Sequence, residues 1–324
     1  MKAYGLMVRD GVTAALELEV GTGNVAEWYA ARDGGQIVNY GVSIGHIPVR
    51  MIVMEDGGEF LPSGAANSQA ADPAQIEEMA RRIGEGLAQG AVAVGLVIAY
   101  TPAASVEEFE TMLAVGLDIT TEAYPYEAGM TRIESVLFDG WEDWDDEQFG
   151  IHQWADTGER LDRESFGRYR AQGGGVIIHS RTEEMTLAAI SNPLTMIASD
   201  GIIDNGKGHP RSTGTYAKVL GRYVRELGVL DLMDALRRMT IAPAERLQER
   251  VPAMTQKGRI RTGADADLTI FDPATVIDRS TYTEPAIPSE GIEYVLVNGV
   301  VVVDRGELVE GVRPGTAVRA SRVP

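Results

Sequence analysis

The stretch from Leu194 to Tyr216 decides the fold and reads Leu-Thr-Met-Ile-Ala-Ser-Asp-Gly-Ile-Ile-Asp-Asn-Gly-Lys-Gly-His-Pro-Arg-Ser-Thr-Gly-Thr-Tyr. Its apolar run ends on Asp200, and Gly201 follows directly, so the backbone is free to turn sharply there. The pattern predicts a buried strand whose carboxyl end presents the Asp200 carboxylate, the place where α/β barrels keep their chemistry. A carboxylate that only caps a turn is the structural alternative.

Amphipathic helices alternate with apolar strands on the amino-terminal side of this stretch. The clearest helix has Asp72 as its N-cap and Pro73 at its first position, and Gly90 ends it. A nearly continuous apolar strand is expected from Ala91 to Ala99. Continuous apolar strands separated by helices predict a parallel sheet covered on both faces, either a βα barrel or a doubly wound sheet.

The composition excludes several classes of function. The 324 residues carry a formal net charge of -19, which disfavours binding to nucleic acid or to an anionic membrane surface. The chain has no cysteine, so disulfides, thiolate metal sites and cysteine nucleophiles are excluded. No apolar run approaches the length of a membrane span or resembles a signal peptide, and a cytoplasmic protein is expected.

Beyond about Thr255 the sequence pattern becomes typical of β structure. Residues 266–271 read as a strand, and residues 294–303 predict a hairpin because Asn298 and Gly299 stand at its turn. We therefore expect two domains, an α/β domain at 1–254 and a small β domain at 255–324.

The four histidines offer few metal ligands. A binuclear hydrolase site usually draws on several histidines at short spacings such as His-x-His, and no such pair occurs here. His179, at the end of an apolar strand, is the candidate ligand, although a hydrogen-bonded structural histidine is the more common occupant of such a position. His46 is expected to have a turn or supporting role, and His152 a structural one.

Three charged residues stand out among the rest. Glu17 and Glu19 alternate along one strand, which is unusual for a buried strand unless that face lines a site. Arg211 follows Asp200 in the same loop and could bind a substrate carboxylate bidentately, whereas a surface ion pair is the simpler explanation.

Several stretches, in this order along the chain, resemble the amidohydrolase superfamily and within it the N-acyl-D-amino-acid deacylases, or D-aminoacylases. The matching stretches are Gly11-Val12-Thr13, Gly45-His46 with Val49-Arg50, Tyr100 to Ser105, Ala123 to Tyr126 with Ala128-Gly129, Ser199-Asp200-Gly201, His209-Pro210-Arg211, Gly258 to Pro273 and Tyr294 to Gly299. The resemblance implies a (β/α)8 TIM-like metal-dependent hydrolase barrel with a small β-sandwich, and hydrolysis of the amide bond of an N-acyl-D-amino acid.

The resemblance also implies roles for individual residues. Asp200 corresponds to the strand-eight metal ligand and general base, and Arg211 to the clamp for the substrate carboxylate. Tyr124, Tyr126 and His209 are grouped with the substrate-binding residues. Glu19 lies near the position of the bridging metal ligand, and His179 completes the metal set that we predict, Asp200, Glu19 and His179. The expected cofactor is zinc, as one or two ions, and the expected partner is a small N-acyl amino acid.

The sequence departs from the family pattern in two places. The opening strand with His-x-His has no counterpart, and the interval from Ser105 to Tyr124 is too short for the two further strands that each supply a ligand histidine. We therefore expect an incomplete barrel with a weakened metal site and an unclosed sheet edge that favours a homo-oligomer. A catalytically inactive relative that acts as a binding or partner-dependent protein is the competing hypothesis.

Overall fold

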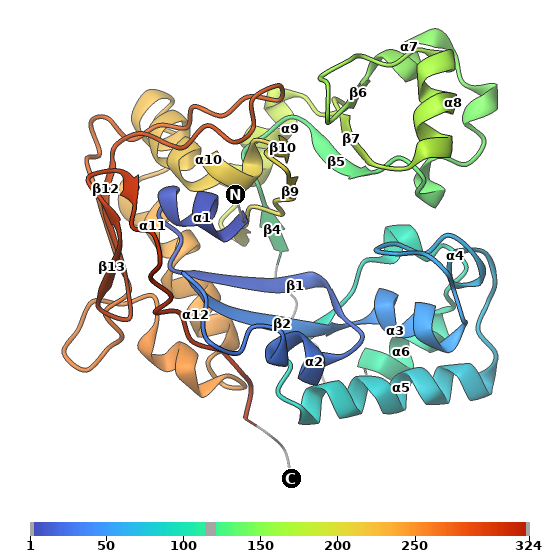
Figure 1. Cartoon of the computed structure of the whole chain (residues 1–324), viewed down its shortest axis with the longest axis horizontal. Helices are drawn as coiled ribbons and strands as arrows, with labels where there is room; N and C mark the ends of the chain where they lie inside the picture. The colour runs from blue at the N-terminus through green and yellow to red at the C-terminus, as the bar shows by residue number, and fades with distance from the viewer. Residues whose placement is uncertain (1–2, 114–120, 322–324) are drawn as a thin grey trace.

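The computed structural model describes residues 3–113 and 121–321 of the chain (Figure 1). Residues 114–120, inside the interval that the sequence predicts to be shortened, lie outside the described part. The α-helices are α1 (Ala3–Arg9), α2 (Val25–Ala30), α3 (His46–Val53), α4 (Ala65–Ser68), α5 (Pro73–Ala88), α6 (Val106–Leu113), α7 (Asp146–Gly150), α8 (Arg163–Gln172), α9 (Glu183–Ser191), α10 (Arg211–Lys218), α11 (Leu232–Met239) and α12 (Ile241–Leu247). Short 3-10 helices occupy Ile98–Tyr100, Val136–Phe138, Trp141–Asp143 and Pro252–Gln256, and a π-helix continues α10 over Val219–Glu226.

The strands within residues 3–113 and 121–321 form five sheets. They are β1 (Ala14–Thr22), β2 (Asn39–Gly45), β3 (Val94–Gly95), β4 (Thr121–Ala123), β5 (Gly129–Arg132), β6 (His152–Trp154), β7 (Gly175–Ile178), β8 (Thr195–Ile197), β9 (Ile203–Asp204), β10 (Lys207–Gly208), β11 (Leu268–Phe271), β12 (Ile292–Val297), β13 (Val300–Asp304) and β14 (Glu307–Leu308). The sheet orders are β1-β2-β3, β4-β8, β5-β7-β6, β9-β10 and β11-β12-β13-β14.

Two of these sheets are parallel, as the apolar strands predict. In the first, β1 pairs with β2 and β2 pairs with β3. Helix α5 packs on this sheet and begins as predicted, because Asp72 and Gln75 form a reciprocal capping box ahead of Pro73. In the second, β4 pairs with β8, so that Ala123 lies opposite Ile197.

The predicted strand from Ala91 to Ala99 is wrong in length. Only Val94 and Gly95 pair as β3, and a 3-10 helix follows at Ile98–Tyr100. Among the described residues β3 has a partner on one side only, so the chain leaves the sheet after Gly95 and the Ile98 side chain is 62% exposed. Burial on both faces, which the apolar run predicts, is therefore not reached.

An antiparallel lobe stands apart from the parallel sheets, at the upper right of Figure 1. It contains β5, β7 and β6 with α7 and α8, and its core is aromatic. The rings of Trp154 and Tyr169 stack with their centroids 4.1 Å apart, while Phe138 and Phe166 meet edge to face. The acidic stretch 139–146 contributes to this core, because its side chains Trp141 and Trp144 pack against it.

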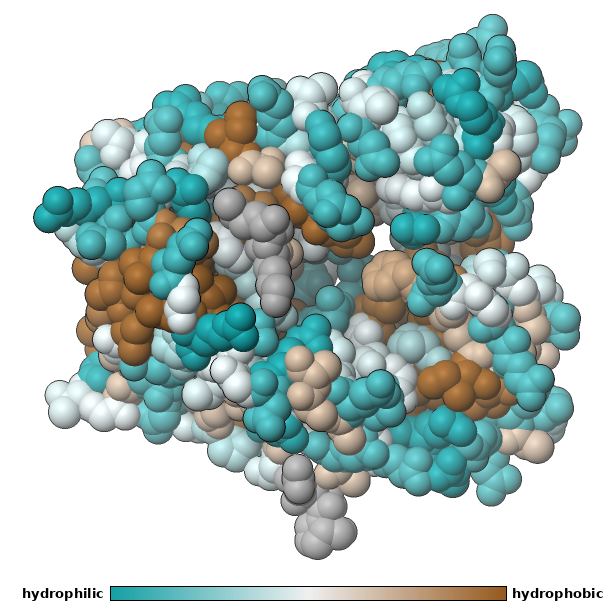
Figure 2. Space-filling model, in the orientation of Figure 1, coloured by the Kyte–Doolittle hydropathy of each residue, from teal (hydrophilic) through white to brown (hydrophobic). Residues whose placement is uncertain are grey.

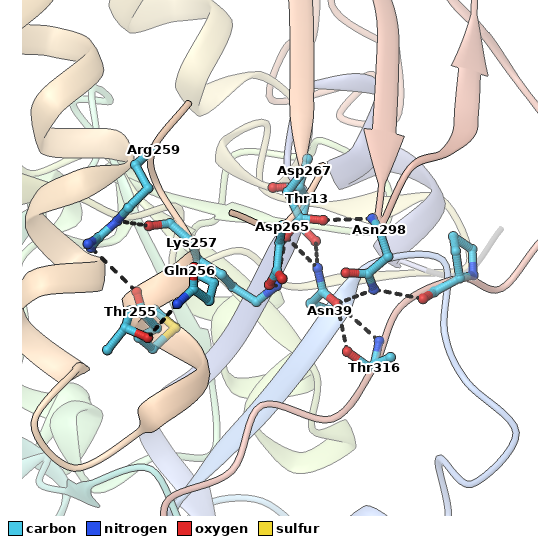
Figure 3. A network of polar contacts seen from close by, with 12 residues as sticks. Thr13, Asn39, Thr255, Gln256, Lys257, Arg259, Asp265, Asp267, Asn298 and Thr316 are labelled. Carbon is cyan, nitrogen blue, oxygen red and sulfur yellow. Dashed lines mark hydrogen bonds and ion pairs between the residues drawn. The ribbon is translucent and has the colours of Figure 1, made fainter. Parts of the chain in front are cut away.

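The carboxyl-terminal strands form a four-stranded antiparallel sheet, and the predicted Asn298-Gly299 hairpin turn is present with φ values of 48° and 81°. Helix α1 packs against this sheet, and Thr269 donates a hydrogen bond to the Gly11 carbonyl at 2.7 Å. A polar network centred on Asn39 joins the sheet to β2 (Figure 3). Segments from the amino-terminal part of the chain, α1 and β2, therefore pack with the carboxyl-terminal sheet as one unit.

No helix in the described ranges combines the length and the apolar character needed to cross a membrane.

Candidate functional site

Asp200 comes three residues after β8 and lies in the left-handed region, with φ of 46°. Aspartate tolerates this conformation better than most residues. Gly201 follows because a Cβ there would lie 2.6 Å from Ser212 Cα, at the start of α10. The turn directs the Asp200 side chain into a cavity of about 380 Å³, where it remains 36% exposed.

The cavity lies between the first parallel sheet and the antiparallel lobe. Strand β1 supplies one wall, and Met130, Thr131 and Arg132 of β5 contribute to the facing wall. Figure 2 shows the surface hollowed between this lobe and the rest of the molecule. Tyr100 closes part of the cavity, and its hydroxyl lies 2.8 Å from Thr131 Oγ1.

Arg211 is the first residue of α10, and its side chain is 1% exposed. Its Nη2 lies 2.8 Å from Asp200 Oδ2. The guanidinium carbon lies 4.2 Å from the centroid of the Tyr124 ring, a cation–π contact that covers one face of the group. Arg211 is absent from the cavity lining, so this structure presents it to Asp200 and not to a ligand.

Carboxylates outnumber cations in the cavity lining. Glu17 and Glu19 of β1 both line it, as does Glu122 of β4. Burial, together with the charge of Asp200 and a hydrogen bond with it, raises the pKa of Glu19 to about 8. Burial and the charge of Asp200 also raise the pKa of Glu122. The predicted metal ligands Glu19 and Asp200 are thus brought together.

His179 lies away from them. It follows β7, and its Nε2 lies 3.0 Å from Gln153 Oε1, on the neighbouring strand β6. Its ring packs against Tyr282 at a centroid distance of 4.8 Å. Burial and then the charge of Arg160 lower the pKa of His179 to about 4. His179 is not part of the cavity lining.

The predicted substrate-binding residues other than Arg211 also lie behind the cavity surface. His209 is fully buried: its Nε2 donates to the Ala128 carbonyl at 3.0 Å and its Nδ1 accepts from the Arg211 amide at 3.1 Å. Tyr126 donates to Asp278 Oδ2 at 3.1 Å, and the Tyr124 hydroxyl accepts from Arg181. These contacts build the support beneath Asp200 and Arg211.

The donor set does not fit a zinc centre. No group of three or more histidine, cysteine, aspartate or glutamate side chains within residues 3–113 and 121–321 is placed to hold a metal ion. Zinc sites in hydrolases draw on imidazole nitrogens, and no histidine lines this cavity. Arg211 also occupies Oδ2 of Asp200.

Two cations in the cavity lining were missed from the sequence. Arg132 and Lys207 both line it. Lys207 belongs to the opening stretch, and the Asn205-Gly206 turn was a signal for the two-residue hairpin on which it lies. Its position at the cavity depends on tertiary packing, which the local pattern does not contain.

Comparisons with known proteins find similar sequences among the amidohydrolases. A sequence profile described as "Amidohydrolase family" matches residues 175–303. The N-acyl-D-glutamate deacylase of Alcaligenes xylosoxydans xylosoxydans is 33% identical over 225 residues, which are 67% of this chain and 44% of that protein. The N-acyl-D-aspartate deacylase of the same organism is 42% identical over 125 residues, 39% of this chain and 24% of that protein. The chain thus spans less than half the length of these relatives.

Solved structures show the same fold. The N-acyl-D-glutamate deacylase of Bordetella bronchiseptica, complexed with zinc and a phosphonate inhibitor, superposes with a TM-score of 0.81 at 23% identity over 98% of this chain and 85% of that one. A D-aminoacylase superposes with a TM-score of 0.79 at 21% identity, with the same coverage. The chain therefore has the TIM-barrel-like fold of these amidohydrolases, as the sequence predicted.

Proposed function

We propose that this chain, which resembles the D-aminoacylase group of the amidohydrolase superfamily, hydrolyses the amide bond of an N-acyl-D-amino acid. The observation that carries the proposal is Asp200, a carboxylate at the end of β8 that faces a cavity and is fixed by a buried arginine. A volume of about 380 Å³ is within the range of small-molecule sites. The names of the matching relatives support the choice of substrate class.

The geometry supports a role for Asp200 in proton transfer. Its carboxylate accepts a proton from water as the water oxygen attacks the amide carbonyl carbon. The same proton passes to the leaving nitrogen when the C–N bond breaks, which gives a carboxylate and a free D-amino acid. Arg211 fixes the orientation of Asp200 through its ion pair at 2.8 Å.

Zinc does not enter this sequence of steps. The prediction of one or two zinc ions rests on the family resemblance, and the described donors do not assemble a site for them. We propose that metal binding by this chain is weak or absent.

A binding protein without catalysis is the second candidate. The observation that favours it is again the pair Asp200 and Arg211: a carboxylate held by arginine with no imidazole beside it lacks the usual metal-assisted machinery. Such a protein would bind N-acyl amino acids in the same cavity without hydrolysing them.

The architecture that we propose is an incomplete barrel with half of a β-sandwich, divided at about residue 254. In support, β3 pairs only with β2 and β4 only with β8 among the described strands. We also propose a homo-oligomer, because the carboxyl-terminal sheet exposes the apolar side chains of Ile270, Val300 and Val301. Figure 2 shows a brown patch at the left of the molecule, where this sheet lies in Figure 1.

Turnover of N-acetyl-D-amino acids, with and without added zinc, tests the enzyme hypothesis. We expect hydrolysis of D-substrates over their L-enantiomers, loss of activity in Asp200→Asn and a retained fold in that variant by circular dichroism. Ligand binding without turnover above buffer would favour the binding protein instead.

A further inference from the structure

We propose that a groove between α2, the end of α5 and the carboxyl-terminal segment binds a free amino acid with an apolar side chain. The groove has a volume of about 550 Å³, which is within the range of small-molecule sites. None of the described residues lines both this groove and the cavity that Asp200 faces. The inference therefore goes beyond the proposed hydrolysis and does not depend on it.

Small side chains keep the groove hollow. Alanines from three separate segments line it, namely Ala26, Ala30, Ala88 and Ala317. The side chain of Gln89, directly after α5, accepts a hydrogen bond from the Ala26 amide at 3.1 Å, which fixes α2 against the end of α5 (Figure 1). Because methyl groups form much of the wall, it offers a ligand apolar contact.

Two buried tyrosines, Tyr29 and Tyr40, form the base of the groove, and their hydroxyls are already hydrogen-bonded. Tyr29 donates to the Val318 carbonyl at 2.7 Å and accepts from the Val42 amide at 3.3 Å. Tyr40 donates to the Arg32 carbonyl at 3.0 Å. These bonds hold both rings in place and leave their apolar atoms toward the groove, which suits an apolar side chain.

Arg319 supplies a cation to the groove. Its guanidinium carbon lies 3.8 Å from the centroid of the Tyr29 ring, which also lines the groove. Within residues 3–113 and 121–321 the guanidinium has no acidic partner and no hydrogen bond. An arginine stacked on an aromatic ring keeps the N–H groups in its own plane, and these match a carboxylate bidentately. Arg319 is therefore placed to bind the carboxylate of a ligand.

Asp33 supplies the opposite charge. It is exposed, it lines the groove, and its amide donates to the Ala30 carbonyl at 3.1 Å in the turn that ends α2. Asp33 and Arg319 do not form an ion pair with each other in this structure, so a ligand can engage both. A ligand with a carboxylate alone would meet Asp33 without a compensating charge, and an amine alone would meet Arg319. The groove therefore fits the ammonium and the carboxylate of an amino acid, with the alanines and tyrosines around its side chain.

Calorimetric titration with three related compounds tests the proposal. Phenylalanine carries both charges, N-acetylphenylalanine lacks the ammonium, and phenylalaninamide lacks the carboxylate. We expect each derivative to bind about tenfold or more weakly than phenylalanine, as for loss of a charge-assisted hydrogen bond. A preference for D-phenylalanine would identify the amino acid that the proposed hydrolysis releases as the source, and a preference for L-phenylalanine would identify the general amino-acid pool. Equal affinity for all three compounds would overturn the inference.

Substitutions in the groove identify the site. Arg319→Gln should weaken phenylalanine binding about tenfold or more and remove its advantage over phenylalaninamide. Arg313→Gln is the matched control, because Arg313 is exposed on the same segment and does not line the groove, and affinity should stay within about twofold. Ala88→Phe fills the groove from the exposed end of α5 and should also weaken binding. Circular dichroism checks that each variant is folded, and unchanged affinity in both Arg319→Gln and Ala88→Phe would contradict the inference.

Asp200→Asn separates the groove from the cavity. Phenylalanine in the groove should bind this variant as it binds the wild type. Binding that Asp200→Asn removes and Arg319→Gln leaves intact would place the amino acid in the cavity, and the inference would be wrong, as it would be if the wild type bound no phenylalanine. If N-acyl-D-amino acids are not hydrolysed, the proposed function fails, whereas phenylalanine binding that depends on Arg319 still supports the inference.

Discussion

Two arginine–carboxylate groups in this chain have similar chemistry and different surroundings. Arg211 pairs with Asp200 at the edge of an open cavity. Arg50 pairs with Glu108, which also lies 2.7 Å from His46 Nε2, and all three side chains are fully buried. The first group leaves a carboxylate accessible to a ligand, and the second leaves nothing accessible.

The arginine of the buried group has further hydrogen-bond partners. Besides Glu108, Arg50 donates to the carbonyl oxygens of Ala66 and Gln69, which joins α3 to α4 and the segment after it. Burial pushes the pKa of Glu108 upwards, but hydrogen bonds from His46 and Arg50 outweigh it, so the pKa lies below its ordinary value. Glu19 has burial and a second carboxylate instead, and its pKa rises to about 8. Solvent access, more than residue type, separates the site from the structural group.

The largest expected effect is on stability, at the buried group. Glu108→Ala leaves the buried charge of Arg50 without its carboxylate, which should lower the free energy of unfolding by about 3–5 kcal/mol. Glu107→Ala, at an exposed neighbour on the same helix, should change it by no more than about 0.5 kcal/mol. Urea denaturation measures both. Equal effects of the two substitutions would remove the distinction between the groups.

Asp10 extends the comparison to a buried carboxyl that has no arginine or lysine among its hydrogen-bond partners. It accepts hydrogen bonds from the amides of Tyr216 and Ala217 and from the Ser289 hydroxyl, yet burial raises its pKa from 3.8 to about 7. The folded state therefore binds more protons than the unfolded state between about pH 4 and pH 7. The stabilisation that protonated Asp10 gives to the folded state is complete below pH 3.8, and it is lost as pH rises through 7.

Asp10→Asn should remove that dependence. At about 1.4 kcal/mol per pKa unit, the free energy of unfolding of Asp10→Asn relative to the wild type should increase by up to about 4 kcal/mol from pH 4 to pH 7. Urea titrations at several pH values give the difference directly. A difference that stays constant with pH would show that the donors around Asp10 keep it ionised throughout.

Asp200→Asn should have a smaller effect on stability than Glu108→Ala. Asp200 is 36% exposed, so water reaches the pair, and asparagine can still accept a hydrogen bond from Arg211. We expect a loss of about 1.5–3 kcal/mol, the range for a hydrogen bond to a charged group, in urea denaturation. A loss as large as that of Glu108→Ala would mean that the Asp200 pair is as structural as the buried group.

Local signals predicted local structure well. Asp72, Pro73 and Gly90 bracket a helix that needs no distant contact to be recognised, and α5 occupies Pro73–Ala88. The Asn298-Gly299 turn likewise determines its own backbone conformation. The position of Asp200 at a strand end followed from the same kind of evidence, since the apolar run and the glycine are adjacent.

Long-range contacts were the part that the sequence did not supply. A full strand at Ala91 to Ala99 would need a second neighbour for β3. The Arg211 guanidinium is covered by the ring of Tyr124, which lies 87 positions earlier in the chain. His209 could be a ligand-binding residue by its chemistry, but Ala128 and the Arg211 amide already use both of its nitrogens. Lys207 lines the cavity only because tertiary packing places its hairpin there.

The smallest expected effect on the free energy of unfolding is that of added zinc. It tests whether the carboxylates of the open cavity bind a metal ion. Glu19 and Asp200 meet in the cavity, but Arg211 holds one oxygen of Asp200, and His179 pairs with Gln153 in the antiparallel lobe. A ligand at one hundred times its Kd stabilises a folded protein by about 2.7 kcal/mol. We expect added zinc to change the free energy of unfolding by less than about 1 kcal/mol, and metal analysis after purification without chelator to find less than one tightly held ion per chain. Two tightly held zinc ions would contradict the donor geometry, because they require nitrogen ligands beside Asp200 that its surroundings do not provide.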